Sequence, residues 1–194
     1  MTLLGAYGRN PRDILARFAL GEPASPDTFY RANLPRVGLG DSAGDTHVPL
    51  VTAVMTSVPI FLAAGDVVTS LSVRSGATAA NTPTNYWVAL YSDAATPALM
   101  AQSADQLTAA WAANTTKTLA LATAQTIART GVYWAAIAVV ATAVPSLLGC
   151  VAMAPIVTGE RNLSQSSGSA LTGTAPSTIA TPTVKQFVPF VVAT

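Results

Sequence analysis

Charged side chains are scarce in this sequence, and this scarcity sets the first limits on its function. The 194 residues include ten basic and nine acidic side chains, 10% of the chain, where ordinary soluble domains have roughly 25%. The formal net charge of +1 excludes the basic surface of a nucleic-acid-binding protein. These charges are too few to cover the outside of a lone protein of this size. We therefore expect a homo-oligomer, the alternative being a neutral monomer coated by threonine and serine.

Cysteine and histidine each occur once. The single Cys150 excludes a disulfide framework and a zinc site built from cysteine pairs. It lies between Gly149 and Val151 in an apolar segment, which favours a small core residue over a reactive thiol. The single His47 is the only candidate base for a hydrolytic triad, and no serine or cysteine in a strained turn accompanies it. We expect His47 to have a capping or interface role.

Carboxylates are equally rare after the first 45 residues, and this counts against a glycosidase. Glycoside hydrolysis needs two carboxyl groups in one cleft. The later part of the chain offers only Asp66, Asp93, Asp105 and Glu160, and we interpret Asp66 and Asp93 as turn residues. We expect no enzymatic activity, no metal site and no cofactor.

No uninterrupted apolar run is long enough to span a membrane as a helix. Such a helix needs about 20 apolar residues, whereas the longest run, Val132 to Val144, is ended by Pro145 and Ser146. Two short buried strands joined by a turn explain this stretch. The first residues of the chain lack the features of a secretory signal peptide. We expect no membrane insertion.

Residues 1–45 differ from the rest, because they contain just over half of the charged side chains. An N-cap at Asn10 followed by Pro11 predicts a short helix over residues 11–20. A helix of this length needs a docking surface to persist in water. We interpret residues 1–45 as an N-terminal anchoring arm. Its candidate docking residues are Ile14, Leu15, Phe18, Phe29 and Tyr30.

Residues 46–194 have the pattern of short strands separated by turns. In Val67–Arg74 the alternation predicts that Val67, Leu71 and Val73 face inward. Leu119 and Leu121 are predicted inward on a strand over 117–127. The remaining predicted elements are a strand over 86–91 with its hairpin partner over 97–104, a pair over 132–141 and 147–154, a long loop over 162–183 and a terminal strand over 187–192. This spacing predicts a mainly β fold, an antiparallel β-sandwich of jelly-roll-like form.

Aromatic residues supply the candidate interface and ligand sites. The strand over 86–91 is apolar on both faces, whereas a two-layer sandwich buries one face of each sheet. We therefore expect a second protomer to cover this strand, with Tyr86, Trp87 and Tyr91 as the candidate subunit interface. Trp111 lies in a predicted connection and is the candidate ligand contact, although packing is the favoured role even there.

Five strand-and-turn segments follow one another between about residues 65 and 155. They are Leu71-Ser72-Val73-Arg74-Ser75-Gly76, Val88-Ala89-Leu90-Tyr91-Ser92-Asp93, Leu99-Met100-Ala101-Gln102-Ser103-Ala104-Asp105, Gly131-Val132-Tyr133-Trp134-Ala135-Ala136 and Val144-Pro145-Ser146-Leu147-Leu148-Gly149. In this order the segments resemble a β-sandwich module of tailed bacteriophages, found in minor tail and fibre proteins of phages of actinobacteria. The resemblance consists of strand-and-turn patterns rather than a chemical signature.

The resemblance implies a structural component of a virion, made in the host cytoplasm and assembled as copies on a symmetry axis. A minor tail or fibre-type protein is favoured, as a trimer that contacts other virion proteins through the arm. The alternatives are a capsid decoration or head-fibre protein, or a module that binds a host cell-surface glycan.

Overall fold

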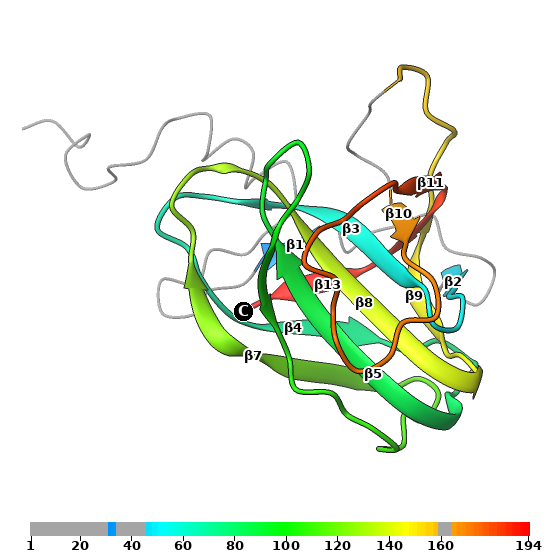
Figure 1. Cartoon of the computed structure of the whole chain (residues 1–194). Coiled ribbons are helices and arrows are strands. Elements are labelled where there is room, and N and C mark those ends of the chain that lie inside the picture. Colours follow the sequence, from blue (N-terminus) through cyan, green and yellow to red (C-terminus); the bar gives the residue numbers. More distant parts are fainter. Residues whose placement is uncertain (1–30, 34–45, 159–163) are drawn as a thin grey trace, which may run out of the picture.

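The computed structural model describes residues 31–33, 46–158 and 164–194, and in these residues the chain is mainly β (Figure 1). Every strand pairing is antiparallel, as predicted. The predicted helix over 11–20 lies outside the described residues. So do the candidate docking residues Ile14, Leu15, Phe18, Phe29 and Tyr30. The strands are β1 (Arg31–Ala32), β2 (Thr46–Pro49), β3 (Met55–Leu62), β4 (Val67–Arg74), β5 (Asn81–Tyr91), β6 (Leu99–Gln102), β7 (Thr116–Thr126), β8 (Gly131–Ala143), β9 (Ser146–Val151), β10 (Ser164–Ser167), β11 (Thr183–Lys185), β12 (Phe187–Pro189) and β13 (Val191–Ala193).

Within the described ranges the strands form three sheets. The largest has six strands in the order β11-β10-β3-β8-β5-β6, and a second has four in the order β1-β13-β4-β7. A small third sheet has the order β12-β9-β2. The predicted hairpin of β5 and β6 is confirmed, with Leu90 opposite Ala101.

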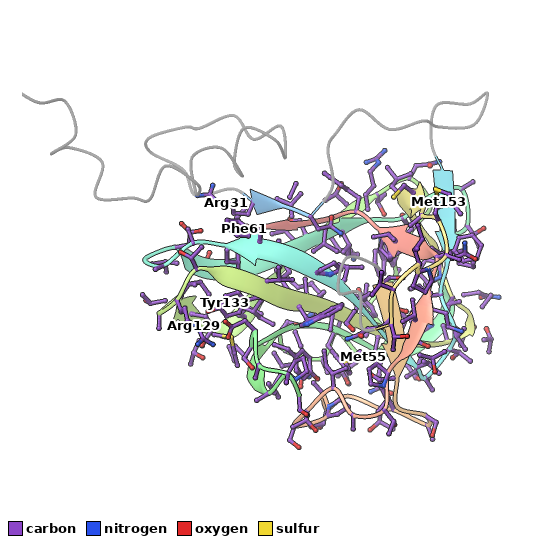
Figure 2. All side chains as sticks on the ribbon, turned by 90° about the horizontal axis from the view of Figure 1, so that it is seen from above. Arg31, Met55, Phe61, Arg129, Tyr133 and Met153 are labelled. Atoms are coloured by element: carbon purple, nitrogen blue, oxygen red, sulfur yellow. The ribbon has the colours of Figure 1, made fainter. Side chains whose placement is uncertain are left out.

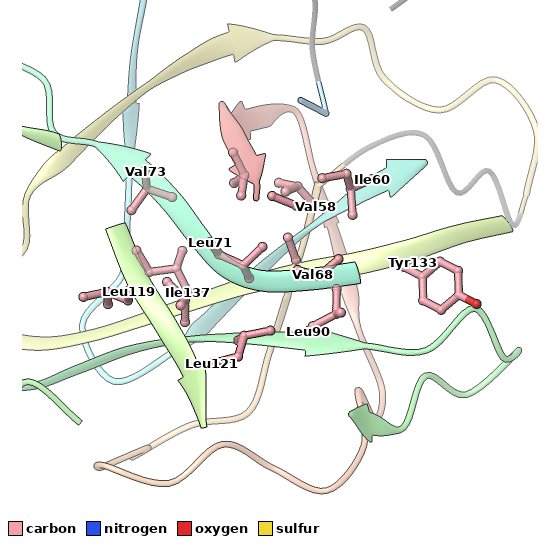
Figure 3. Close-up of a cluster of buried hydrophobic side chains, with 14 of the residues drawn as sticks. Val58, Ile60, Val68, Leu71, Val73, Leu90, Leu119, Leu121, Tyr133 and Ile137 are labelled. Carbon is pink, nitrogen blue, oxygen red and sulfur yellow. The ribbon is translucent and has the colours of Figure 1, made fainter. Parts of the chain in front are cut away.

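The main core contains apolar side chains of both larger sheets (Figure 3). From the four-stranded sheet, Leu71 on β4 and Leu119 and Leu121 on β7 are buried there, as the alternation predicted. From the six-stranded sheet, the buried side chains include Leu90 on β5 and Ile137 on β8. Burial of such side chains is the dominant favourable term in folding.

The other face of the six-stranded sheet is covered by the chain itself. Residues 168–182, here called the strap, connect β10 to β11 and contribute Ala175 and Ile179 to a second apolar cluster. This cluster includes Trp87 and Tyr91, which are both 0% exposed. The strand over 86–91 is therefore apolar on both faces, as predicted, but the expectation that a second protomer covers it is wrong. The cover is a loop of the same chain, within the stretch over 162–183 predicted as a long loop.

The first residue of β4 does not face the core, although the alternation predicted that it would. Val67 is 41% exposed, whereas Val68 is fully buried and Leu71 and Val73 point inward as expected. The cause is a shift in the pairing register with β7 between Val68 and Ser70. Such an irregularity moves the following side chains to the opposite face.

Two further strand predictions are corrected by the pairing. The predicted pair over 132–141 and 147–154 is wrong, because β8 lies between β3 and β5 while β9 pairs with β2 and β12. The predicted terminal strand over 187–192 is two strands in two sheets. They separate at Phe190, with β12 beside β9 and β13 beside β4.

The predicted arm and the β region meet earlier than residue 45. Strand β1 pairs with β13, Arg31 lying opposite Ala193. Asn33 then extends this contact, because its amide nitrogen donates to the carbonyl of Pro189 and its amide oxygen accepts from the N–H of Val191, each at 2.8 Å. Residues 31–33 therefore belong to the four-stranded sheet rather than to a separate arm.

Candidate functional site

The described carboxylates, Asp66, Asp93 and Asp105, are dispersed and hold structural contacts. Within residues 31–33, 46–158 and 164–194, no three histidine, cysteine or acidic side chains lie close enough to hold a metal ion. Asp66 forms a buried ion pair with Arg31 at 3.3 Å and accepts the N–H of Ala63 at 2.8 Å. These contacts join β1 to the turn before β4.

Asp93 and Asp105 have equally structural surroundings. Asp93 pairs with Arg129 at 2.9 Å on the surface, where the arginine side chain is 73% exposed. Asp105 accepts hydrogen bonds from the side chain of Asn85 and from the N–H of Tyr86. Asp93 therefore joins the loop after β5 to the loop before β8, and Asp105 joins the loop after β6 to β5.

Cys150 and His47 lie on neighbouring strands of the small sheet, with His47 opposite Leu148 in the β2–β9 pairing. Cys150 is partly buried, and burial raises the pKa of its thiol. A raised pKa reduces the thiolate fraction and with it the nucleophilic reactivity. Cys150 packs against the main core, in agreement with its predicted role.

The structure overturns the candidate ligand contact at Trp111. This side chain is 1% exposed, its indole N–H donates to the carbonyl of Thr115, and its ring lies 5.5 Å from that of Tyr86. Tyr86 itself is 1% exposed and faces the main core. Trp111 belongs to that core and has almost no exposed surface to offer a sugar.

The strap covers Trp87 and Tyr91 and accepts a hydrogen bond from each of these side chains. The indole N–H of Trp87 donates to the carbonyl of Thr172 at 2.7 Å, and the Tyr91 hydroxyl donates to the carbonyl of Pro176 at 2.8 Å. Gln102 on β6 adds two bonds at 2.7 Å each, donating to Gly173 and accepting from Ala175. The candidate subunit interface at Tyr86, Trp87 and Tyr91 is therefore interior.

An exposed apolar surface lies instead at the end of the small sheet. Exposed large apolar side chains lie at the end of β9, on the segment that follows it, on the paired strand β12, and on β11, which precedes β12 in the chain. Figure 1 shows this segment projecting from the body of the molecule, and Figure 2 shows Met153 at the end remote from Arg129. We call this surface the apolar tip. Its members and their exposed fractions are Val151 (57%), Met153 (81%), Ile156 (86%), Val157 (63%), Val184 (43%) and Phe187 (42%).

Strand pairing holds the base of the apolar tip in place. Val151 lies opposite Phe187 at the end of the β9–β12 ladder. One residue further, the N–H of Ala152 donates to the carbonyl of Gln186 at 2.7 Å, and the Gln186 side chain donates back to Ala152 at 3.1 Å. The exposed side chains therefore rise from a hydrogen-bonded base.

Charge is almost absent from this surface. Residues 151–158 contain no ionisable side chain, and Lys185 is the one charged residue within 183–189. Sequence reasoning missed the apolar tip because residues 147–154 were predicted as a buried strand. The available signal was the loss of alternation after Val151, where Ala152, Met153 and Ala154 precede Pro155.

In the described residues no helix has the length and apolarity needed to cross a membrane. Comparison of the whole chain with models of protein families and with curated proteins finds no match.

Proposed function

We propose that this chain is a structural component of a bacteriophage virion, a minor tail or fibre-type protein that assembles as a symmetric homo-oligomer. The observation that carries the assembly role is the apolar tip, whose residue Met153 is 81% exposed in a single chain. Exposed apolar surface, where it is larger than single scattered side chains, marks interaction sites. The scarcity of charge over the whole chain supports the same role.

The virion assignment is supported by the resemblance of the segments within residues 65–155 to phage tail and fibre modules. The jelly-roll-like sandwich is part of this proposal. Side chains of the four-stranded and six-stranded sheets share the main core, as the two inner faces of a sandwich do. A trimer is the favoured assembly, and a capsid decoration protein is the alternative location.

Residues 1–30 are the proposed anchoring arm, because residues 31–33 already belong to the four-stranded sheet. Their partner would be another virion protein. The glycan-binding alternative loses its named contact, since Trp111 is buried.

Two measurements on the full chain test this proposal. Sedimentation velocity at several concentrations should give an oligomer, and a lone 19.8 kDa species at high concentration would overturn the assembly role. Immunogold labelling of intact particles, with an antibody against residues 46–158, should mark the tail. Label on the capsid would replace the tail by the decoration role, and particles without label would refute the virion assignment.

A further inference from the structure

We infer that the apolar tip is the contact between copies of this chain, so that tips of neighbouring protomers meet around the symmetry axis. This inference rests on the proposed function, because it identifies the surface through which the proposed oligomer forms. It replaces the interior residues Tyr86, Trp87 and Tyr91 as the assembly surface.

The size of the apolar tip fits a contact between proteins. Its six side chains together expose on the order of 600 Å², the upper end of what one patch on a monomer shows. A stable interface buries roughly 800 Å² on each partner. The apolar tip with the polar atoms around it supplies most of that area.

The charge of the apolar tip favours a second copy as its occupant. Residues that lie at the axis of a closed symmetric assembly meet their own copies in the neighbouring protomers. A surface carrying charge of one sign would there face its own charge and be repelled. Residues 151–158 carry no charge, and the charged residues nearest to the apolar tip in the sequence, Lys185, Glu160 and Arg161, include both signs, so the described part of the apolar tip can meet itself without such repulsion.

The position and support of the apolar tip allow this meeting. It projects at one end of the molecule (Figures 1 and 2), so that other copies can approach without contact between their larger sheets. Its base is fixed by the pairing of Val151 with Phe187. A base that is already held by strand pairing loses little conformational freedom on binding.

Substitution within the apolar tip tests the inference against a matched control. Val151 and Val51 are valines of equal exposure, 57% and 56%, and Val51 follows β2 while Val151 ends β9. We would measure the association constant of the full chain and of the V151D, M153D and V51D variants by sedimentation equilibrium. An introduced carboxylate would face its symmetry mates, so V151D and M153D should each weaken association by about tenfold or more. The V51D variant should associate like the parent.

Each outcome separates this inference from the proposed function. Unchanged oligomers of both V151D and M153D would overturn the inference while leaving the oligomeric virion protein intact. A monomeric parent would overturn both. Because Met153 lies outside any strand, M153D keeps the test valid if V151D disturbs β9, and circular dichroism checks the fold of each variant.

Two other modes of contact, one through the arm and one between the apolar tip and lipid, predict different results. If deletion of residues 1–30 abolishes association while M153D does not, the arm makes the contact and the inference is wrong. If the parent is monomeric but floats with phosphatidylcholine vesicles, and M153D does not, the apolar tip binds lipid and the inference is equally wrong. Self-association of the parent that is lost in M153D and kept without residues 1–30 supports it.

Discussion

Asp66 and Asp93 each pair with an arginine, but water reaches the two pairs to very different extents. The side chains of Arg31 and Asp66 are 9% and 2% exposed, whereas the Arg129 side chain of the second pair is 73% exposed. An exposed ion pair contributes little to the free energy of unfolding, because solvent screens the attraction between the two charges. A buried pair depends on both partners, since removal of one takes away a charge that compensates the other in the interior.

This difference predicts unequal effects of the same substitution. The D66N variant leaves Arg31 charged and buried, and should lower the free energy of unfolding by about 3 kcal/mol. The D93N variant should lower it by less than about 1 kcal/mol. Urea denaturation followed by circular dichroism measures both. Equal losses in the two variants would show that the Arg31–Asp66 pair is solvated in solution.

Two buried tyrosines predict how stability changes at alkaline pH. Burial raises the pKa of Tyr91, and burial followed by the charge of Asp93 raises the pKa of Tyr133. In the unfolded chain the pKa of tyrosine is about 10. Above that pH the unfolded state has lost these protons while the folded state keeps them, so stability is complete below about pH 10 and falls as pH rises further.

The Y91F variant removes one of these two contributions. It should be less stable by about 1 kcal/mol at neutral pH, because the bond to Pro176 is lost. Its stability should then fall less steeply than that of the parent above about pH 10. Urea denaturation at pH values on both sides of 10 gives the two slopes, and identical slopes would contradict the prediction.

At the scale of elements, the strap has the most specific attachment. Its apolar residues Ala175 and Ile179 are buried, and Gln102 holds its backbone by two hydrogen bonds. Gly173 approaches closely here, since a Cβ at this position would lie 2.3 Å from a carboxylate oxygen of Asp105. Side-chain bonds and close approach together fix the strap on the sheet.

The Q102A variant should loosen the strap without unfolding the sheets. The carbonyl of Gly173 and the N–H of Ala175 then lose their side-chain partner. Amide exchange over 171–179 should therefore accelerate by about tenfold or more. The Q125A variant is the control, because the Gln125 side chain donates to its near neighbour Thr123 and, among the described residues, has no hydrogen bond to the strap. Hydrogen–deuterium exchange with mass spectrometry measures both, and equal protection in the two variants would refute the role of Gln102.

The elements also show what the sequence can predict here. Local alternation sufficed for Leu71, Val73, Leu119 and Leu121, because side-chain direction in a strand has a period of two. It failed at Val67, because the register shift in β4 depends on its partner strand. The cover of Trp87 could not be found at all, since the strap lies about 85 residues away in the chain and its Ser/Thr/Gly/Pro composition predicts only a loop.

At the scale of the whole molecule, two truncations test how much β1 contributes to stability. Removal of residues 1–30 leaves β1 in place, whereas removal of 1–45 also deletes Arg31 and the bonds of Asn33 to Pro189 and Val191. The longer deletion should therefore unfold at a lower temperature, by about 10 °C or more. Differential scanning calorimetry compares the two, and equal midpoints would show that β1 adds nothing to the sheet.

Association and unfolding in this protein can be followed by separate signals. All three tryptophans, Trp87, Trp111 and Trp134, are at most 2% exposed, and none belongs to the apolar tip. Their fluorescence should be blue-shifted and resistant to acrylamide in the native chain, and it should change little when copies join or separate. Tryptophan emission therefore reports exposure of the core on unfolding, while light scattering reports the number of copies in the assembly. The two signals together distinguish a variant that dissociates from one that unfolds.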